Sequence, residues 1–492
     1  MHGNLNHNLP DDPVKTDFPE EILEQIAGIF EGDSPRKCFV SCSLQIPPID
    51  PLSLIEQRIE DSYLYYWERP NRDFSLAAGG MVTSLKATGS DRFKEIGTQS
   101  RQLKKQVVSI GCLNHSLAEP LLVGGYSFAD HNISTTWKKF GAAHFILPEW
   151  TLIKSGKLNL LTLTVPIKDR DQSEVIQQLK ELLTTHDRIS SDIRSYFKPG
   201  TSDDYSAQTV KLKDSSKKNW EKQVQKSKEL IRRGRFEKVV IARQVELTSN
   251  HPIQVPLAMY HLRKLYPECY NFISRMDGGA YFMGATPERL ISLRKDLMKT
   301  EGLAGSISRG RSATEDVSLG HTLMESDKER SEHDFVVRDI RNTLKKHSHR
   351  IEHPSQPSLK KLSNVQHLYT PISAKIHDST TIHELAGVLH PTPAVGGFPK
   401  TNAVPFINQI EDVDRGWYAG PTGWFNLKGF GELAVAIRSA WVENNRAQLY
   451  AGCGIVEDSD PLTEWEETRM KFRPLLDALT KATVKKNDEP TN

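Results

Sequence analysis

The sequence predicts an α+β fold built on large, mainly antiparallel β-sheets, and three observations support this prediction. Short β-rich runs separated by glycine-containing turns fill residues 36–165. Over residues 220–480, helical and strand patterns mix without the strict β-α-β alternation that builds a parallel sheet. The chain has 492 residues, 37% of them hydrophobic, which is enough to bury a large core.

Residues 1–219 are predicted to form a sheet-rich N-terminal region. Residues 1–20 are polar and are expected to be frayed. Apolar side chains at helical spacing predict a helix over Ser173–Thr185, and the polar segment 189–217 is expected to be a surface connection. Among the β-rich runs, strands are expected at Lys37–Leu44, Gln106–Ile110 and Leu158–Val165.

Residues 220–480 are predicted to form the catalytic region, because the residues suited to chemistry gather there. The segment His353–Leu359 is expected to connect a charged helix to the next ordered run, and residues 481–492 are expected to be a disordered tail. The expected elements are, in order, a helix over Trp220–Arg233, a strand over Lys238–Leu247, a helix over Val255–Tyr266, a hairpin over Tyr270–Leu293, a long helix over Ser318–Leu344, strands around Ala434–Val442 and Ala447–Ile455, and a final helix.

The charge and cysteine content exclude several classes of protein. The 64 Lys and Arg residues against 62 Asp and Glu residues give a formal net charge of +2, which removes the main electrostatic reason to expect nucleic acid or an anionic membrane as a partner. No uncharged apolar stretch reaches the roughly 18 residues of a transmembrane helix. The five cysteines form no C-x-x-C pair, so neither a disulfide framework nor a thiolate zinc site is indicated. We therefore expect a cytoplasmic protein that acts on a small molecule.

Three charged side chains stand beside apolar runs, and each admits two interpretations. Lys238 opens the run KVVIAR; it is either a strand-end lysine that reaches solvent or a desolvated lysine that acts as a base. Glu288, in GATPERL, is either a solvated or helix-capping residue after a turn or part of a site. Arg438, in the expected strand AVAIRSAW, either pairs with a nearby acid or binds a ligand carboxylate in bidentate fashion.

Two pairs of glutamates share the spacing E-x-x-E. Glu329 and Glu332 lie in DKERSEHDFVVRDI, where helical periodicity directs both toward the apolar side of their helix. Glu464 and Glu467 repeat the spacing in EWEETRMK, with Lys471 one turn further along the same face. Each pair alone is commonly a solvated helix face. Two such pairs favour a compensating cation without excluding solvated helix faces, and ligands that are all oxygen suit Mg²⁺ better than Zn²⁺.

The second of these helices has a clear start, with Asp460 as the expected N-cap and Pro461 at the first helical position. Pro474, three residues past Lys471, interrupts the helical pattern and leaves the end of the helix open.

Three glycine-rich turns, GLAGSISRG, HPTPAVGGFP and AGCGI, flank the charged groups. Glycine lets backbone N–H groups approach an anion, but none of these turns has a Walker A or dinucleotide-binding fingerprint, and each alone is more often an ordinary turn or bulge. His383 and His390 are seven residues apart, which does not match H-E-x-x-H and excludes a metalloprotease of that class.

Together the motifs KVVIAR, GATPERL, LAGSISRG, EHDFVVRDI, HPTPAVGGFP, AVAIRSAW and YAGCGIVEDSDPLTEWEET resemble those of the chorismate-utilising enzymes, in the family's order over residues 220–480. The resemblance implies a sandwich of β-sheets with helices packed outside and a Mg²⁺-dependent reaction of chorismate. The family members that use ammonia from a glutaminase partner do not resemble this chain at Lys238. No glutaminase partner is therefore expected. Ala394 separates it from salicylate synthases, which carry threonine there.

Isochorismate synthase is therefore the activity that the resemblance favours, with quinone or siderophore synthesis as the expected use of the product. A bifunctional salicylate synthase and a non-catalytic chorismate-binding subunit are the alternatives. A monomer is expected by analogy with stand-alone members. Cys453 departs from the family pattern, which often has alanine there.

The resemblance also implies roles for individual residues. Lys238 matches the lysine that activates water, and Glu288 matches the general acid. The residues matching Mg²⁺ ligands are Glu332 and Glu467, with Glu329 and Glu464 holding the metal's waters. The residues matching substrate-binding positions are Gly305, Ser306, Arg438, Gly452 and Lys471 for the carboxylates, and His367 and Ala394 for the ring.

Overall fold

A computed structural model describes residues 18–31, 37–111, 115–130, 134–195, 210–363 and 365–483 of the chain. The predicted fraying of residues 1–17, the middle of the predicted connection (196–209) and residues 484–492 of the predicted tail lie outside the described residues.

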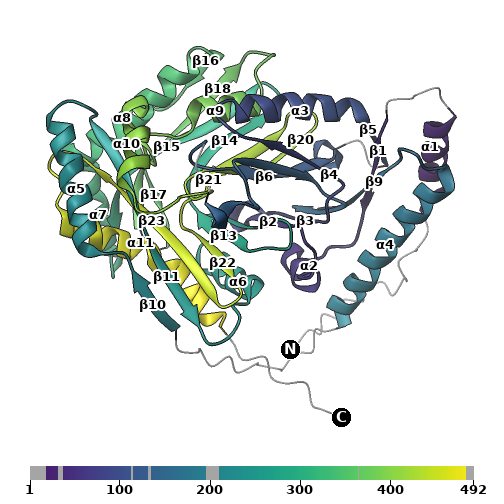
Figure 1. The fold of residues 1–492 in the computed structure, drawn as a ribbon. Helices are drawn as coiled ribbons and strands as arrows, with labels where there is room; N and C mark the ends of the chain where they lie inside the picture. Colours follow the sequence, from purple (N-terminus) through teal and green to yellow (C-terminus); the bar gives the residue numbers. More distant parts are fainter. Residues whose placement is uncertain are drawn as a thin grey trace, which may run out of the picture.

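In these residues, thirteen strands form one large sheet, and each neighbouring pair is antiparallel except β1 with β5 (Figure 1). The pairing of β2 with β12, in which Tyr66 lies opposite Ile273, joins a strand of the N-terminal region to a strand of the region after residue 220. In their order across the sheet the strands are β10 (Val210–Asp214), β11 (Lys238–Ser249), β23 (Arg446–Ile455), β22 (Ser439–Glu443), β13 (Tyr281–Thr286), β12 (Tyr270–Arg275), β2 (Leu64–Arg69), β3 (Phe74–Gly79), β8 (Trp150–Ser155), β9 (Leu158–Pro166), β1 (Phe39–Gln45) and β5 (Val107–Gly111), with β19 (Gly397–Phe398) paired to β11.

A second sheet has ten strands within the described residues, all in antiparallel pairs. It also combines early and late parts of the chain, because β6 pairs with β20. Its strands are, in order, β16 (Ser348–Glu352), β18 (Val365–Ile376), β15 (Leu297–Ser308), β14 (Arg289–Arg294), β21 (Gly431–Val435), β20 (Pro421–Asn426), β6 (Leu121–Tyr126), β7 (Ala143–Leu147) and β4 (Thr83–Ala87), with β17 (Ser358–Lys361) paired to β18.

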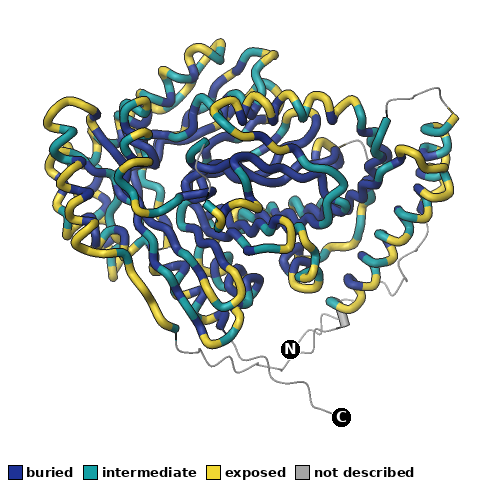
Figure 2. The backbone as a smooth tube through the Cα atoms, viewed as in Figure 1, coloured by how far each residue is buried: buried dark blue, intermediate teal, exposed yellow. Residues whose placement is uncertain are grey.

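Helices surround the two sheets, and their outward faces carry the exposed residues while the strands are mainly buried (Figure 2). The predicted α+β fold with large, mainly antiparallel sheets and helices outside is therefore confirmed. The helices are α1 (Glu20–Phe30), α2 (Pro51–Gln57), α3 (Arg92–Gln106), α4 (Gln172–Ser195), α5 (Lys217–Arg232), α6 (Val255–Leu265), α7 (Ala313–Glu325), α8 (Asp327–Leu344), α9 (Ile382–Leu389), α10 (Lys400–Ile410) and α11 (Pro461–Lys481).

Strand alternation divides the buried side chains into two cores. On β2, Tyr65 and Trp67 belong to the core shared by the two sheets, whereas Leu64 and Tyr66 face the helices on the other side of the first sheet. The second core includes side chains from α1, α2, α4, α6 and α11. The first sheet is thus covered on both faces.

Two short connections carry the chain between the sheets. Only Pro287 and Glu288 separate β13 in the first sheet from β14 in the second. The chain returns through residues 436–438, between β21 and β22. Hydrogen bonds join the connections, because Val435 N donates to the Glu288 carbonyl (3.1 Å) and Ala285 N to the Arg438 carbonyl (3.1 Å).

The long helix predicted over Ser318–Leu344 is wrong, because α7 and α8 are separate helices that meet at Ser326. Ser326 has extended backbone dihedrals, and its side chain accepts a hydrogen bond from Glu329 N, as an N-cap does. Residues 325–334 are all polar or charged, so no apolar spacing marks where one helix ends and the next begins.

Two further predictions of strands are corrected. Arg438 does not lie in a strand: it has a positive φ of 51° and occupies the connection between β21 and β22. The hairpin predicted over Tyr270–Leu293 consists of β12 and β13 only, and β14 pairs in the other sheet. In both cases the chain changes sheet within a continuous β-rich pattern.

Three boundaries also differ. Helix α4 extends to Ser195, beyond the predicted Thr185, and His353–Leu359 connects β16 to β17 rather than a helix to the next run. Helix α11 continues past Pro474 to Lys481, because Leu475 and Leu479 in its last turns are buried in the second core. The predicted N-cap at Asp460 is confirmed by its hydrogen bond from Thr463 N (2.9 Å).

No helix among the described residues is both long and apolar enough to cross a membrane.

Candidate active site

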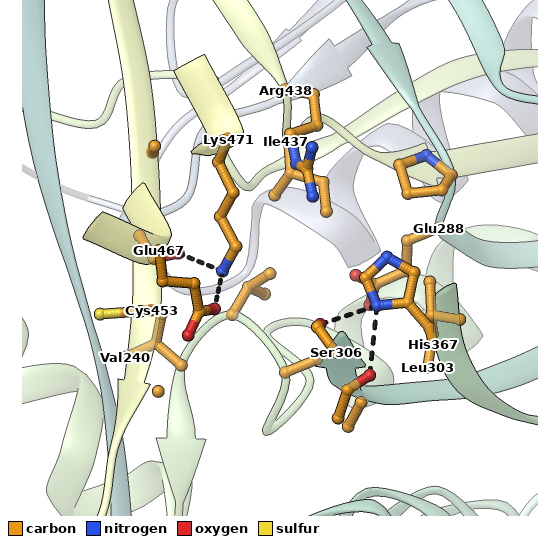
Figure 3. A pocket seen from close by; sticks show the side chains of 18 of the residues that line it. Val240, Glu288, Leu303, Ser306, His367, Ile437, Arg438, Cys453, Glu467 and Lys471 are labelled. Carbon is orange, nitrogen blue, oxygen red and sulfur yellow. Dashed lines mark hydrogen bonds and ion pairs between the residues drawn. The ribbon is translucent and has the colours of Figure 1, made fainter. Parts of the chain in front are cut away.

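A pocket lies where the two inter-sheet connections meet β11, β23, α8 and α11, and it encloses about 770 Å³ of empty space, counting its opening to solvent. Figure 3 shows the charged side chains Glu288, Arg438, Glu467 and Lys471 around it. Ten of the thirteen predicted site residues line this pocket: Glu288, Gly305, Ser306, Glu332, His367, Ala394, Arg438, Gly452, Glu467 and Lys471. The other three, Lys238, Glu329 and Glu464, lie directly behind this lining, in the contacts described below.

Lys238 is the first residue of β11 and is only 2% exposed, so it is not a solvent-reaching strand-end lysine. Its ammonium lies 2.5 Å from Glu332 Oε1 on α8. The glycine at position 454 makes room for this side chain, because a Cβ there would lie 2.5 Å from Lys238 Cε. The segment AGCGI, which was predicted as a turn, is the end of strand β23, and it serves the lysine by close backbone approach. Most of GLAGSISRG, also predicted as a turn, likewise lies in strand β15.

Lys471 and Glu467 form a second ion pair, 2.6 Å apart, one turn along α11. Lys471 also donates a hydrogen bond to the carbonyl of Gly452 (2.8 Å; Figure 3). Burial disfavours the charge on Glu467, but the neighbouring ammonium outweighs it and lowers the pKa of the carboxyl. The same contact raises the pKa of Lys471 against its own burial, so the pair stays charged.

The pKa values of the two remaining glutamates are shifted upward, in the opposite direction to that of Glu467. Burial and the charge of Glu332 raise the pKa of Glu329. Burial and the charge of Glu467 raise the pKa of Glu464. The four carboxylates therefore act on one another across the gap between α8 and α11, with two lysines as their cationic neighbours.

This set of residues fits a divalent cation by its chemistry. Its donors are all carboxylate oxygens. Burial and, after it, mutual repulsion raise the pKa of Glu329 and of Glu464, and a bound cation would counter both effects. Two of the carboxylates are engaged by lysines, and within the described residues no three acidic, histidine or cysteine side chains already converge as a metal site. Metal binding would thus require Glu332 and Glu467 to reorient from these ion pairs.

Glu288 is a buried acid in the first inter-sheet connection. It is 4% exposed, and its Oε1 accepts a hydrogen bond from Thr392 Oγ1 (3.3 Å). Burial and the nearby charge of Glu301 raise its pKa to about 7. A carboxyl group in this state is protonated in neutral solution often enough to donate a proton.

Arg438 is held at the second inter-sheet connection, and no carboxylate among the described residues forms an ion pair with its guanidinium. Burial lowers its pKa, although an arginine remains charged. A buried cation that lines a pocket without a paired acid is suited to an anionic ligand.

Gly305, Ser306 and His367 form the side of the pocket that belongs to the second sheet. Gly305 has a φ of 76°, and the register of β15 with β18 shifts at this residue. A residue with a side chain would adopt this positive φ only with strain. Ser306 Oγ lies 2.8 Å from His367 Nδ1, and Ser306 N donates to Glu329 Oε2 (3.2 Å). Burial, with the charges of Arg438 and Lys471, lowers the pKa of His367 to about 3, so the ring is neutral.

Tyr418 also lines the pocket, although no sequence motif indicated it. Its ring stacks on Tyr450, with centroids 5.3 Å apart, and burial raises its pKa to about 12, so its hydroxyl keeps its proton. The sequence WYAG carries no signal for this position.

Arg243 is a further residue that the motifs did not single out. It is 2% exposed, its Nε donates to Thr468 Oγ1 (2.7 Å), and its guanidinium lies 3.6 Å from the centre of the Trp465 ring. It also pairs with Asp214. Trp465 and Thr468 directly follow Glu464 and Glu467 on α11. By holding the first two residues, Arg243 fixes the position of the helix that carries the acidic pair.

Comparison with known proteins relates the chain as a whole to one enzyme family. The family model described as chorismate binding enzyme matches residues 23–480. The chain is 33% identical over 475 residues to isochorismate synthase MenF of Bacillus subtilis, covering 95% of this chain and 98% of the relative. It is 36% identical over 471 residues to the salicylate biosynthesis isochorismate synthase of Pseudomonas aeruginosa, covering 94% and 95%.

The fold is also shared with a solved structure. The menaquinone-specific isochorismate synthase MenF of Escherichia coli superposes with a TM-score of 0.74 at 26% identity, over 93% of this chain and 99% of that one.

Proposed function

Because the chain belongs to the chorismate-binding enzyme family, we propose that it is a Mg²⁺-dependent isochorismate synthase that converts chorismate to isochorismate. The observation that carries the proposal is the buried pocket where Glu288, which can hold a proton, meets two lysine-carboxylate pairs and Arg438, with which no carboxylate of the described residues pairs. Chorismate, with two carboxylates on a small ring system, matches that combination of charges.

Arg438 and Lys471 supply the positive charge that would bind the substrate's carboxylates. The backbone at Gly305 and Gly452 provides close approach beside them, and Ser306 offers a hydroxyl. Neutral His367 and Ala394 would pack against the ring without adding charge.

Two proton transfers complete the proposed reaction. Acting as a neutral amine, Lys238 would take a proton from water as the water oxygen bonds to C2 of the ring. The C1=C2 double bond would then move to C1=C6, and the C5=C6 double bond would move to C4=C5. Glu288 would give its proton to the hydroxyl that leaves C4 as water. One water enters and one leaves, so the overall change is an isomerisation.

Glu332 and Glu467 are the proposed direct ligands of Mg²⁺, with Glu329 and Glu464 holding its waters. When bound, the ion would chelate the ring carboxylate and draw electron density from the ring. The role of the protein is to bring the two acidic helices together and to keep Lys238 within reach of Glu332, at 2.5 Å.

The proposal is tested with the purified chain, chorismate and Mg²⁺. We expect isochorismate to form, formation to stop on removal of Mg²⁺ with a chelator, and Lys238→Ala and Glu288→Ala to reduce kcat/KM by at least about a hundredfold. Lys226→Ala, which removes an exposed lysine on α5, serves as the matched control and should retain full activity. A folded protein that binds chorismate without turnover would instead identify a binding subunit.

Product analysis distinguishes the bifunctional alternative. Salicylate and pyruvate released in equal amounts would show that the chain also eliminates the side chain of isochorismate. We propose that the product supplies quinone or siderophore synthesis, and deletion of the gene followed by supplementation with each end product tests which of the two depends on it.

A further inference from the structure

A buried ion pair outside the lining of the catalytic pocket holds the first inter-sheet connection. Glu301 on β15 is 4% exposed, and its Oε1 lies 2.8 Å from the ammonium of Lys360 on β17. Both side chains belong to the second sheet, and neither lines the pocket. No step of the proposed reaction uses this pair, although taking two charges out of water is costly.

The pair bonds to the backbone on both sides of Glu288. Lys360 Nζ donates a hydrogen bond to the carbonyl of Pro287 (2.6 Å), and Glu301 Oε1 accepts one from Arg289 N (3.0 Å). The residues before and after the acid are thus fixed by the two members of one ion pair. Hydrogen bonds with a charged partner are stronger than neutral ones, so the connection is held firmly.

Side chains hold the chain here because the regular pairing of β14 with β15 ends before the connection. The pairing nearest to the connection joins Ser292 to Lys299. Beyond it, Thr300 Oγ1 donates to the carbonyl of Leu290 (2.7 Å), and Glu301 continues the same arrangement toward the acid. Strand β15 therefore positions the start of β14 through its side chains rather than through its backbone.

Glu301 is an ionised neighbour of the acid. Burial disfavours its charge, but the ammonium of Lys360 and the guanidinium of Arg289 outweigh burial and lower the pKa of Glu301. The charge of Glu301 opposes the ionisation of Glu288, whereas the charge of Lys360 favours it. The two members of the pair therefore act on the proton of Glu288 in opposite directions.

The other charged groups of the pocket engage one another rather than this connection. Lys238 pairs with Glu332, and Lys471 pairs with Glu467. Within the described residues, the side chains of these four and of Arg438 make no hydrogen bond to residues 287–289. Burial keeps the remaining titratable groups of the lining neutral, by lowering the pKa of the first and raising the pKa of the others: His367, Tyr418 and Cys453. The ion pair of β15 and β17 is therefore the one that reaches the backbone beside the acid.

We propose that Glu301 and Lys360 are positioning residues for the proton donor: they fix its backbone, and their opposite charges set the pH at which it releases its proton. Neither side chain touches the reacting atoms, so both act through Glu288. The inference rests on the proposed function, in which Glu288 is the general acid.

Infrared spectroscopy of the full chain without substrate measures the proton of Glu288 directly. The signal is the protonated-carboxyl band that disappears when Glu288→Gln is added to the same chain, followed in a pH titration. Glu301→Gln leaves Lys360 unopposed, so the midpoint of the titration should move down by at least about one pH unit. Lys360→Met removes the cation, so the last proton held by Glu288 and Glu301 should be lost at a pH at least about half a unit higher.

A double change separates the effect of charge from the effect of packing. Glu301→Gln combined with Lys360→Met disturbs more contacts than Glu301→Gln alone, but it removes the unopposed cation. The midpoint should therefore return at least about half of the way to that of the unaltered chain, whereas a purely structural pair would shift it further. Glu352→Gln is the matched control, because it removes an exposed carboxylate of the same sheet that pairs with Arg350 (2.8 Å), and it should leave the midpoint unchanged.

Turnover provides a second measurement. With chorismate and Mg²⁺, Glu301→Gln should move the fall of kcat/KM at high pH in the same direction as its infrared midpoint. A chain that shows the infrared shifts without turnover would overturn the proposed function and leave this inference standing.

The inference itself is overturned if isochorismate forms but the infrared midpoint of Glu301→Gln equals that of the unaltered chain. Shifts of Glu301→Gln and Lys360→Met in the same direction would also overturn it. Circular dichroism verifies that each compared chain is folded. If Glu301→Gln does not fold, Lys360→Met decides alone, and an unchanged or lower midpoint in that variant contradicts the inference.

Discussion

Glu288 must be protonated to act as an acid, and burial favours that form because the charged carboxylate would be costly there. Its pKa of about 7, against an ordinary 4.5, means that the folded chain holds this proton more tightly than the unfolded chain does. Stability that is fully present below pH 4.5 is therefore lost as the pH rises through about 7. That difference corresponds to about 3 kcal/mol at most.

We therefore predict that Glu288→Gln stabilises the protein in alkaline solution while abolishing its activity. Urea unfolding should show a gain of up to about 3 kcal/mol at pH 8 and less than about 1 kcal/mol at pH 5, because glutamine fills the site without a charge. The exposed Glu221→Gln on α5 is the control and should show no such pH dependence. An equal effect of Glu288→Gln at both pH values would contradict the burial argument.

The same residue predicts the pH dependence of the reaction. As Glu288 loses its proton, kcat/KM for chorismate should fall as the pH rises through about 7. A pH profile of the wild type between pH 5.5 and 9 measures the effect. A kcat/KM that does not change across this range would show that Glu288 is not the proton donor.

At the scale of elements, the start of α8 determines where the first acidic pair lies. Ser326 Oγ accepts a hydrogen bond from Glu329 N (3.4 Å), and Ser312 Oγ makes the equivalent contact with Glu315 N (3.2 Å) at the start of α7. We predict that Ser326→Ala and Ser312→Ala each cost about 1 kcal/mol of stability. Only Ser326→Ala should also raise the Mg²⁺ concentration needed for half-maximal activity, and equal effects of both variants on Mg²⁺ would argue against this placement.

Helix α11 is positioned by Arg243 from β11, the strand that also carries Lys238. Arg243→Met should cost about 2 kcal/mol, since it removes the hydrogen bond to Thr468 and the stacking on Trp465. It should also lower kcat/KM and raise the Mg²⁺ requirement, because Glu464 and Glu467 lose their fixed position. Arg473→Met, on the exposed face of the same helix, is the control and should change neither quantity.

At the scale of the whole molecule, both sheets join early and late parts of the chain. A fragment of residues 217–483 would lack β2 and β6 and would expose the edges of β12 and β20. We predict that the fragment aggregates and that the full chain unfolds in one cooperative transition. Differential scanning calorimetry tests this prediction. Two well-separated transitions would show that residues 1–219 fold by themselves. The boundary at residue 219 stays a prediction.

The sequence predicted much of the fold because hydrophobic periodicity is local. Strand β11 and helix α5 lie within a few residues of the predicted positions, and the N-cap Asp460 was recognisable from the residues that follow it. The change of sheet after Pro287 was not predictable, because a strand pattern does not record which partner the strand will have.

The same distinction applies to the candidate site. The E-x-x-E pairs could be assigned to helix faces from their spacing, but the contact of Lys238 with Glu332 joins residues 94 positions apart and depends on how β11 meets α8. Tyr418 and Arg243 were missed for this reason: their importance comes from neighbours that are distant in the sequence.

The two connections between the sheets have a consequence for how this chain can vary in length. Pro287 and Glu288 alone span the gap from β13 to β14, so inserting or deleting one residue there would turn every following side chain of β14 to the opposite face or break its pairing. The outermost strands β4, β5, β10 and β16 have no such restriction on their outer side. Natural insertions and engineered fusions should therefore be tolerated beside the outermost strands and not at the two connections between the sheets, whose lengths are fixed.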